Sequence, residues 1–195
     1  MSNYVTAIGL DVHARSISAC AFDPMTGEVS RARFGYDPAS VAEWALGFES
    51  PKAVYESGPT GFHLCRALGA LGVDCAVGAV SKMHRPAADR GRKNDRRDAE
   101  WLARLLACRN VVEAWVPDER TEAARDLSRA LEDARDDLQR ARQRMSKFLL
   151  RHGLVFDEAT PTGRRRSNWT EAYWRWARSI EFDEADDAAA YECIW

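Results

Sequence analysis

The sequence lacks an apolar run of the roughly 18 residues that a membrane-spanning helix requires. Its first ten residues also lack the basic leader and apolar core of a secretory signal. Five cysteines are present, but no two stand at metal-ligand spacing, and their odd number argues against a closed disulfide framework. These absences predict a cytoplasmic protein with reduced thiols.

A large excess of one charge is absent as well. The 30 acidic residues nearly balance the 28 basic ones, and the net charge is -2. No global positive field therefore indicates nucleic-acid binding, and any such binding must be local. With 195 residues, 46% of them hydrophobic, the chain can bury a core of ordinary size, which predicts one domain plus an appendage.

The first 80 residues alternate between strand-like and helix-like patterns. Three β-favouring runs, at 4–12, 17–23 and 30–36, are joined by short links and predict an antiparallel meander. Two helices and two further strands then follow in alternation, at 37–48, 53–55, 60–71 and 73–80. The order βββαβαβ predicts an α/β fold with a mixed sheet and flanking helices, the ribonuclease H-like arrangement.

A basic segment follows the last of these strands. Residues 82–110 hold nine basic and four acidic residues, of which the first half is expected to be a loop and 95–108 a helix. This segment is the local positive patch that could hold a nucleic-acid backbone. The residues expected to bind nucleic acid are Lys82, Arg85, Arg90, Arg92, Lys93, Arg96 and Arg97.

A long helix is expected after Pro117. Apolar residues recur there in alternating steps of four and three, at Leu127, Leu131, Ala134, Leu138, Ala141, Met145 and Phe148. This heptad seam predicts a coiled coil and a homo-oligomer held through residues 124–148. We therefore divide the chain into a domain at 1–115, a coiled-coil helix at 116–153, and a helical segment at 154–195 that begins a truncated region.

Four acids are candidates for a metal site. Asp11 and Glu56 each follow an apolar strand, and they would emerge at one sheet edge if those strands are neighbours. Asp95 and Asp98 stand three residues apart and share a helical face. Four gathered carboxylates repel one another unless a divalent cation intervenes, and Mg²⁺ or Mn²⁺ suits an all-oxygen shell. Two such ions stabilise the attacking and leaving oxygens of a phosphodiester.

Three stretches in order resemble one known family: AIGLDVHARSISACAFD, AVYESGPTGFHLCRAL and KMHRPAADRGRKNDRRDAEWLARLL. They are similar to the amino-terminal domain of the insertion-sequence-110 family of DEDD transposases, relatives of the Piv/MooV-type DNA recombinases. The resemblance covers residues 4 to 153. It implies a RuvC-like catalytic and metal site of Asp11, Glu56, Asp95 and Asp98, an oligomer, and a structured guide RNA encoded by the element.

The chain departs from the family pattern at Ala14, where lysine is common, and at Asn94, where threonine is common. Neither change removes a carboxylate. The family also carries a nucleophilic serine in a separate carboxy-terminal domain, which this chain lacks. We therefore expect a transposase that cleaves and joins DNA in transposition but that is incomplete by itself.

Three alternatives remain open at this point. A RuvC-like structure-selective nuclease, such as a junction resolvase, would need only the four acids. A fragment without catalysis could dimerise and bind DNA or RNA through residues 85–97 and 140–151. The actin-like kinases share the strand order, but they need glycines after the first acid, where Val12 and His13 stand here.

Overall fold

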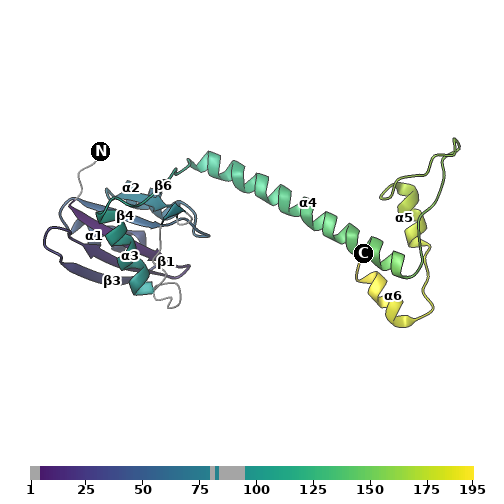
Figure 1. Cartoon of the computed structure of the whole chain (residues 1–195), viewed down its shortest axis with the longest axis horizontal. Helices are drawn as coiled ribbons and strands as arrows, with labels where there is room; N and C mark the ends of the chain where they lie inside the picture. Colours follow the sequence, from purple (N-terminus) through teal and green to yellow (C-terminus); the bar gives the residue numbers. More distant parts are fainter. Residues whose placement is uncertain (1–4, 80–81, 84–94) are drawn as a thin grey trace. The chain divides into compact units, whose positions relative to one another are not determined.

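The computed structural model describes residues 5–79, 82–83 and 95–195, and it describes only the backbone of residues 95 and 96 (Figure 1). The chain divides into two compact units, Met1–Asp118 and Glu119–Trp195. No helix within the described ranges has an apolar stretch long enough to cross a membrane.

The first unit is built on a six-stranded mixed sheet with the order β3-β2-β1-β4-β5-β6. Strands β3, β2 and β1 pair antiparallel, β1, β4 and β5 pair parallel, and the short β6 returns antiparallel to β5. The strands are β1 (Thr6–Val12), β2 (Ser16–Phe22), β3 (Val29–Gly35), β4 (Pro51–Glu56), β5 (Asp74–Gly78) and β6 (Glu113–Ala114). The five strands expected from the sequence are all present, and β6 was not expected because two residues carry no periodicity.

Two helices cover one face of this sheet. They are α1 (Pro38–Leu46) and α2 (His63–Ala70), and α1 begins at Asp37, whose side chain accepts from the backbone N–H groups of Ala39 and Ser40. That carboxylate satisfies two N–H groups that a helix start otherwise leaves open. The core on this face includes the fully buried side chains of Ile8, Leu10, Tyr55, Leu64 and Leu68.

A third helix, α3 (Asp95–Ala107), lies on the opposite face (Figure 1). It packs against β1 at Gly9, where a Cβ atom would collide with the carbonyl oxygen of Ala99 and the amide nitrogen of Ala103. Ala7 and Val54 pack with Leu102 and Leu106 of the helix. The glycine thus allows α3 to approach the central strand closely, and alternate residues of β1 face the two different layers.

The second unit consists of α4 (Glu119–Arg151), α5 (Glu171–Arg178) and α6 (Ala185–Glu192). Its core gathers the last turns of α4 with aromatic side chains of the segments that follow: Met145, Phe148, Leu149, Phe156, Tyr173, Ala177 and Tyr191. Helix α6 lies within the segment 154–195 that the sequence predicts to be helical. It is held by Tyr191, whose hydroxyl donates to the carbonyl oxygen of Ala177 at 2.9 Å.

The apolar seam of α4 differs in burial along its length. Met145 and Phe148 are buried in the core of the second unit, whereas Leu127, Leu131 and Leu138 are 73%, 52% and 50% exposed. The single chain therefore uses only the last part of its heptad pattern for internal packing. The earlier part presents leucines to solvent.

Candidate active site

Asp11 and Glu56 lie side by side on neighbouring parallel strands. The register of β1 and β4 ends with Leu10 opposite Tyr55, and one residue further along it places Asp11 beside Glu56. Neighbouring parallel strands lie about 4.8 Å apart. Leu10 and Tyr55 belong to the core under α1 and α2, so the next residue of each strand points to the α3 face.

Asp11 is mostly buried, with 19% of its side chain exposed, and His13 contacts it. The distance from His13 Nε2 to Asp11 Oδ2 is 3.0 Å. The backbone N–H of His13 donates to the carbonyl oxygen of Ser16 at 2.9 Å, which closes the turn between β1 and β2. From the sequence, His13 is most simply a structural residue; the structure places its ring within hydrogen-bond distance of a candidate acid.

Glu56 is the last residue of β4, and its Oε1 atom is buried. The backbone N–H of Ser57 donates to the carbonyl oxygen of Gly78 at 2.9 Å, so the pairing of β4 with β5 holds the backbone directly after the acid. The connection to α2 is fixed from the other face by Tyr55, whose hydroxyl donates to the carbonyl oxygen of Gly61 at 2.9 Å. Burial raises the pKa of this tyrosine, which therefore stays neutral and able to donate.

Asp98 lies on α3 and is only 6% exposed. It directly precedes Ala99, the residue whose carbonyl oxygen approaches Gly9 of β1. Further along the helix, the guanidinium of Arg104 lies 4.7 Å from the ring centre of Phe22, which pairs with Ala7 at the start of β1. Helix α3 therefore runs antiparallel to β1, and its first turn lies toward the end of β1 that carries Asp11.

Asp95 is the first residue of α3, and its side chain lies outside the description. Among the described side chains, no group of three His, Cys, Asp or Glu residues is arranged to hold a metal ion. The donor chemistry nevertheless suits a hard cation, because Asp11, Glu56 and Asp98 all offer carboxylate oxygens. Glu56 of β4 and the first turn of α3 with Asp98 both lie toward the end of β1 that carries Asp11. Asp98 is buried, and so is the Oε1 atom of Glu56. A bound cation would offset the free-energy cost of holding a charged carboxylate away from water.

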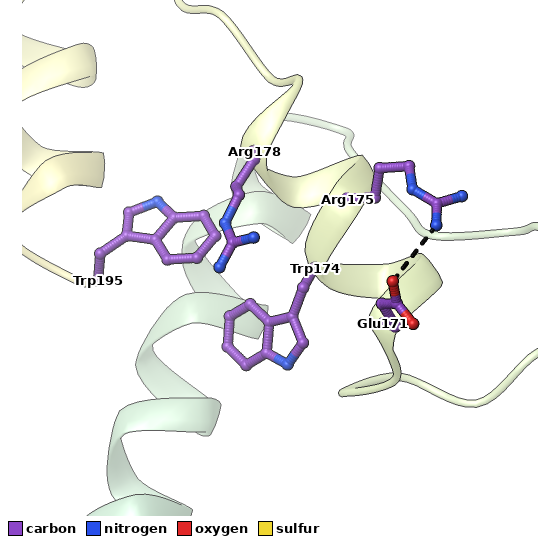
Figure 2. A pocket seen from close by; sticks show the side chains of 5 residues that line it. All are labelled: Glu171, Trp174, Arg175, Arg178 and Trp195. Atoms are coloured by element: carbon purple, nitrogen blue, oxygen red, sulfur yellow. Dashed lines mark ion pairs between the residues drawn. The ribbon is translucent and has the colours of Figure 1, made fainter.

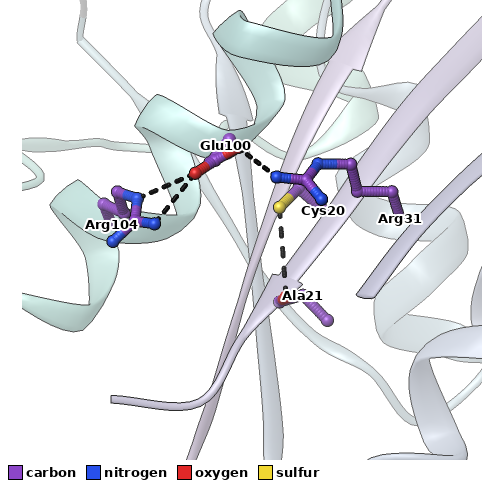
Figure 3. Close-up of polar contacts among 5 residues, drawn as sticks. All are labelled: Cys20, Ala21, Arg31, Glu100 and Arg104. Atoms are coloured by element: carbon purple, nitrogen blue, oxygen red, sulfur yellow. Dashed lines mark hydrogen bonds and ion pairs between the residues drawn. The ribbon is translucent and has the colours of Figure 1, made fainter. Parts of the chain in front are cut away.

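Helix α3 is fixed on the sheet by an ion-pair cluster that the sequence did not reveal (Figure 3). Arg31 of β3 donates from Nη2 to Glu100 Oε2 at 2.6 Å, and Arg104 donates to Glu100 Oε1 from Nε at 3.0 Å and Nη2 at 2.9 Å. These hydrogen bonds lower the pKa of Glu100. Cys20 lies beneath the cluster, and burial raises the pKa of its thiol to about 11.

Sequence patterns offered only part of this cluster. Glu100 and Arg104 stand at the favourable i, i+4 spacing, and this part of the cluster is visible in the sequence. The contact with Arg31 joins residues 69 positions apart, so it depends on the sheet order and on which face of β3 each residue occupies.

The residues expected to bind nucleic acid fall partly within the description. Lys82 and Arg97 are exposed, and Arg97 adjoins the buried Asp98 on α3. These two neighbouring residues of opposite charge thus occupy different environments. Outside the described residues or side chains lie Arg85, Arg90, Arg92, Lys93 and Arg96.

The second unit has a pocket of about 660 Å³, lined by Glu171, Trp174, Arg175, Arg178 and Trp195 (Figure 2). None of the four candidate acids lines it. Its one carboxylate, Glu171, forms an ion pair with Arg175 at 3.6 Å, and the two indole rings contact each other with centroids 5.3 Å apart. This pocket offers no set of groups for phosphodiester chemistry.

Comparison with known proteins connects these elements to a family. A family model of DEDD transposases of the insertion-sequence-110 type, described as "Transposase", matches residues 8–153. The chain is 40% identical over 157 residues to the Sinorhizobium fredii (strain NBRC 101917 / NGR234) protein named "Putative transposase y4qE"; the match covers 80% of this chain and 38% of that protein. It is 31% identical over 182 residues to the Leptospira borgpetersenii "Transposase for insertion sequence element IS1533", covering 90% of this chain and 51% of that protein. The chain spans about half or less of the length of these two relatives.

Proposed function

Because the chain belongs to the insertion-sequence-110 family of DEDD transposases, we propose that residues 1–115 form a RuvC-like, ribonuclease H-like domain that cleaves and joins DNA in transposition. One observation carries this proposal. Asp11 and Glu56 adjoin on parallel strands, and the first turn of α3, with Asp95 and Asp98, lies toward the same strand ends.

The residues that would hold Mg²⁺ or Mn²⁺ are Asp11, Glu56, Asp95 and Asp98. When bound, such ions would polarise a phosphodiester and stabilise the charge that develops on its oxygens. The protein's part is positioning. The β1–β4 pairing sets Asp11 and Glu56 side by side. The close contact at Gly9 sets the distance between α3 and the sheet, and the ion pairs of Glu100 orient α3 about its own axis.

The basic residues of the 82–97 segment would hold the DNA backbone beside the acids. Lys82 and Arg97 are exposed, as this role requires. The other residues proposed for it are Arg85, Arg90, Arg92, Lys93 and Arg96.

The remaining partners follow from the family and from α4. We propose a homo-oligomer through residues 124–148, because leucines of that seam are exposed in the single chain. We further propose a structured guide RNA and a nucleophilic serine in a separate domain as the other components of the reaction. A cytoplasmic location agrees with five free thiols.

A RuvC-like nuclease that only hydrolyses DNA would use the same four acids. The two activities differ in their products, because a nuclease leaves cut ends whereas a transposase also forms new joints. Product analysis on a gel distinguishes them.

Metal binding tests the site directly. We expect calorimetry to show binding of about two Mn²⁺ ions per wild-type chain and none to the Asp95→Ala, Asp98→Ala double variant. Asp133 and Asp136 of α4 have the same i, i+3 spacing and are exposed, so the Asp133→Ala, Asp136→Ala variant is a matched control that should bind like wild type. A folded wild-type chain that binds no metal would contradict the proposed site.

A further inference from the structure

A row of side chains crosses the sheet at the level of the candidate acids and ends in an arginine. Arg33 of β3 pairs with Ser18 of β2, and Ser18 pairs with Asp11 of β1. Asp11 lies beside Glu56 when the β1–β4 register is continued by one residue. Residues in register on neighbouring strands point to the same face, so Arg33 shares the α3 face with both acids.

Two arginines on this edge strand differ in what surrounds them. Arg31 occupies the same face two residues earlier, and its charge is already compensated by Glu100 (Figure 3). Arg33 is exposed, and within the described part of the chain no acid forms an ion pair with it. Because β3 is the edge of the sheet, solvent or a ligand can approach Arg33 from the side.

We propose that Arg33 binds a backbone phosphate of the DNA strand that lies across the candidate acids. This inference rests on the proposed function. Arg33 is two strands away from Asp11, about 10 Å between Cα atoms, so it would contact a phosphate that flanks the reacting one. A guanidinium binds phosphate through two parallel hydrogen bonds, and its charge offsets the repulsion between DNA and the acids.

A salt titration tests this contact without requiring catalysis. Binding of the whole chain to a labelled DNA duplex of arbitrary sequence is measured by fluorescence anisotropy at several salt concentrations, without divalent metal. We expect Arg33→Gln to reduce the slope of log affinity against log salt by about one, since one phosphate contact is lost. The loss should be equal for different DNA sequences, because phosphate contacts carry no sequence information.

Arg31→Gln is the matched control, because it removes the same charge from the same strand. It should leave the salt slope unchanged and lower the melting temperature, whereas Arg33→Gln should leave the melting temperature unchanged. An unchanged slope for folded Arg33→Gln, or an equal decrease in both variants, would overturn the contact. So would a wild-type chain that does not bind DNA, or a slope change seen only with an RNA duplex.

Failure of the proposed metal site and failure of the Arg33 contact give different results. If the wild-type chain binds no Mn²⁺ while Arg33→Gln still reduces the slope, the DNA contact holds and the metal site is wrong. If Mn²⁺ binds and the slope does not change, the metal site holds and the contact is wrong.

Discussion

Gly9 is a residue at which a single methyl group would disturb both the fold and the site. The added Cβ would meet the carbonyl oxygen of Ala99 and the amide nitrogen of Ala103, which are backbone atoms and cannot rotate away. Helix α3 would have to lift from β1. We expect Gly9→Ala to lower the free energy of unfolding by about 1–3 kcal/mol. Metal affinity should fall with it, because α3 carries Asp95 and Asp98; urea unfolding and a Mn²⁺ titration measure the two effects.

Gly69 provides the control for this substitution. It lies within α2, and a Cβ there would meet nothing within 4 Å. Alanine is favoured over glycine in a helix by about 0.5–1 kcal/mol, so Gly69→Ala should be neutral or stabilising and should leave metal binding unchanged. Equal loss of stability in both variants would show that Gly9 has no special packing role.

Helix α3 depends on Glu100 for its attachment to β3, and this attachment should vary with pH. Hydrogen bonds from Arg31 and Arg104 lower the pKa of Glu100 in the folded chain. The pKa of Glu100 is therefore lower in the folded chain than in the unfolded chain, where it is about 4.3, so ionised Glu100 stabilises the fold at pH values above about 4.3. This contribution to stability is lost as the pH falls through the pKa of Glu100 in the folded chain. Because the arginines are half exposed, we expect Glu100→Gln to cost about 1 kcal/mol or less at pH 7.

The pH dependence distinguishes this ion-pair role from simple packing. The difference in unfolding free energy between wild type and Glu100→Gln should be present at pH 7 and should shrink toward zero at acid pH, where Glu100 is protonated. Urea unfolding at both pH values measures it. A difference that is the same at both values would mean that shape, rather than charge, attaches the helix.

The elements show where sequence patterns carry information and where they do not. Apolar runs ending in an acid placed Asp11 and Glu56 on strands, because burial of consecutive residues leaves a local signal. No local sequence signal marks the contact of Arg31 with Glu100 or the row of side chains that ends at Arg33. Both depend on the register of three neighbouring strands. Helix α6 lies within the predicted helical segment 154–195, but its bounds leave little periodic signal, because Tyr191 is its one buried residue.

At the scale of the whole molecule, the exposed leucines of α4 support the proposed homo-oligomer. Leu127, Leu131 and Leu138 are all at least half exposed, and they continue a seam whose later members are buried. We expect the wild-type chain to associate in solution and the triple substitution of these leucines by serine to prevent it. Light scattering would then give the mass of a single chain for the variant.

Leu150 provides the control that distinguishes loss of the heptad seam from loss of an exposed leucine elsewhere on α4. It lies on the same helix, is 65% exposed and falls outside the heptad pattern, so Leu150→Ser should leave the oligomer unchanged. The circular dichroism of the triple variant should resemble that of wild type at high concentration, because the second unit keeps its buried contacts around Met145 and Phe148. A wild-type chain that is already monomeric would contradict the proposed homo-oligomer through residues 124–148.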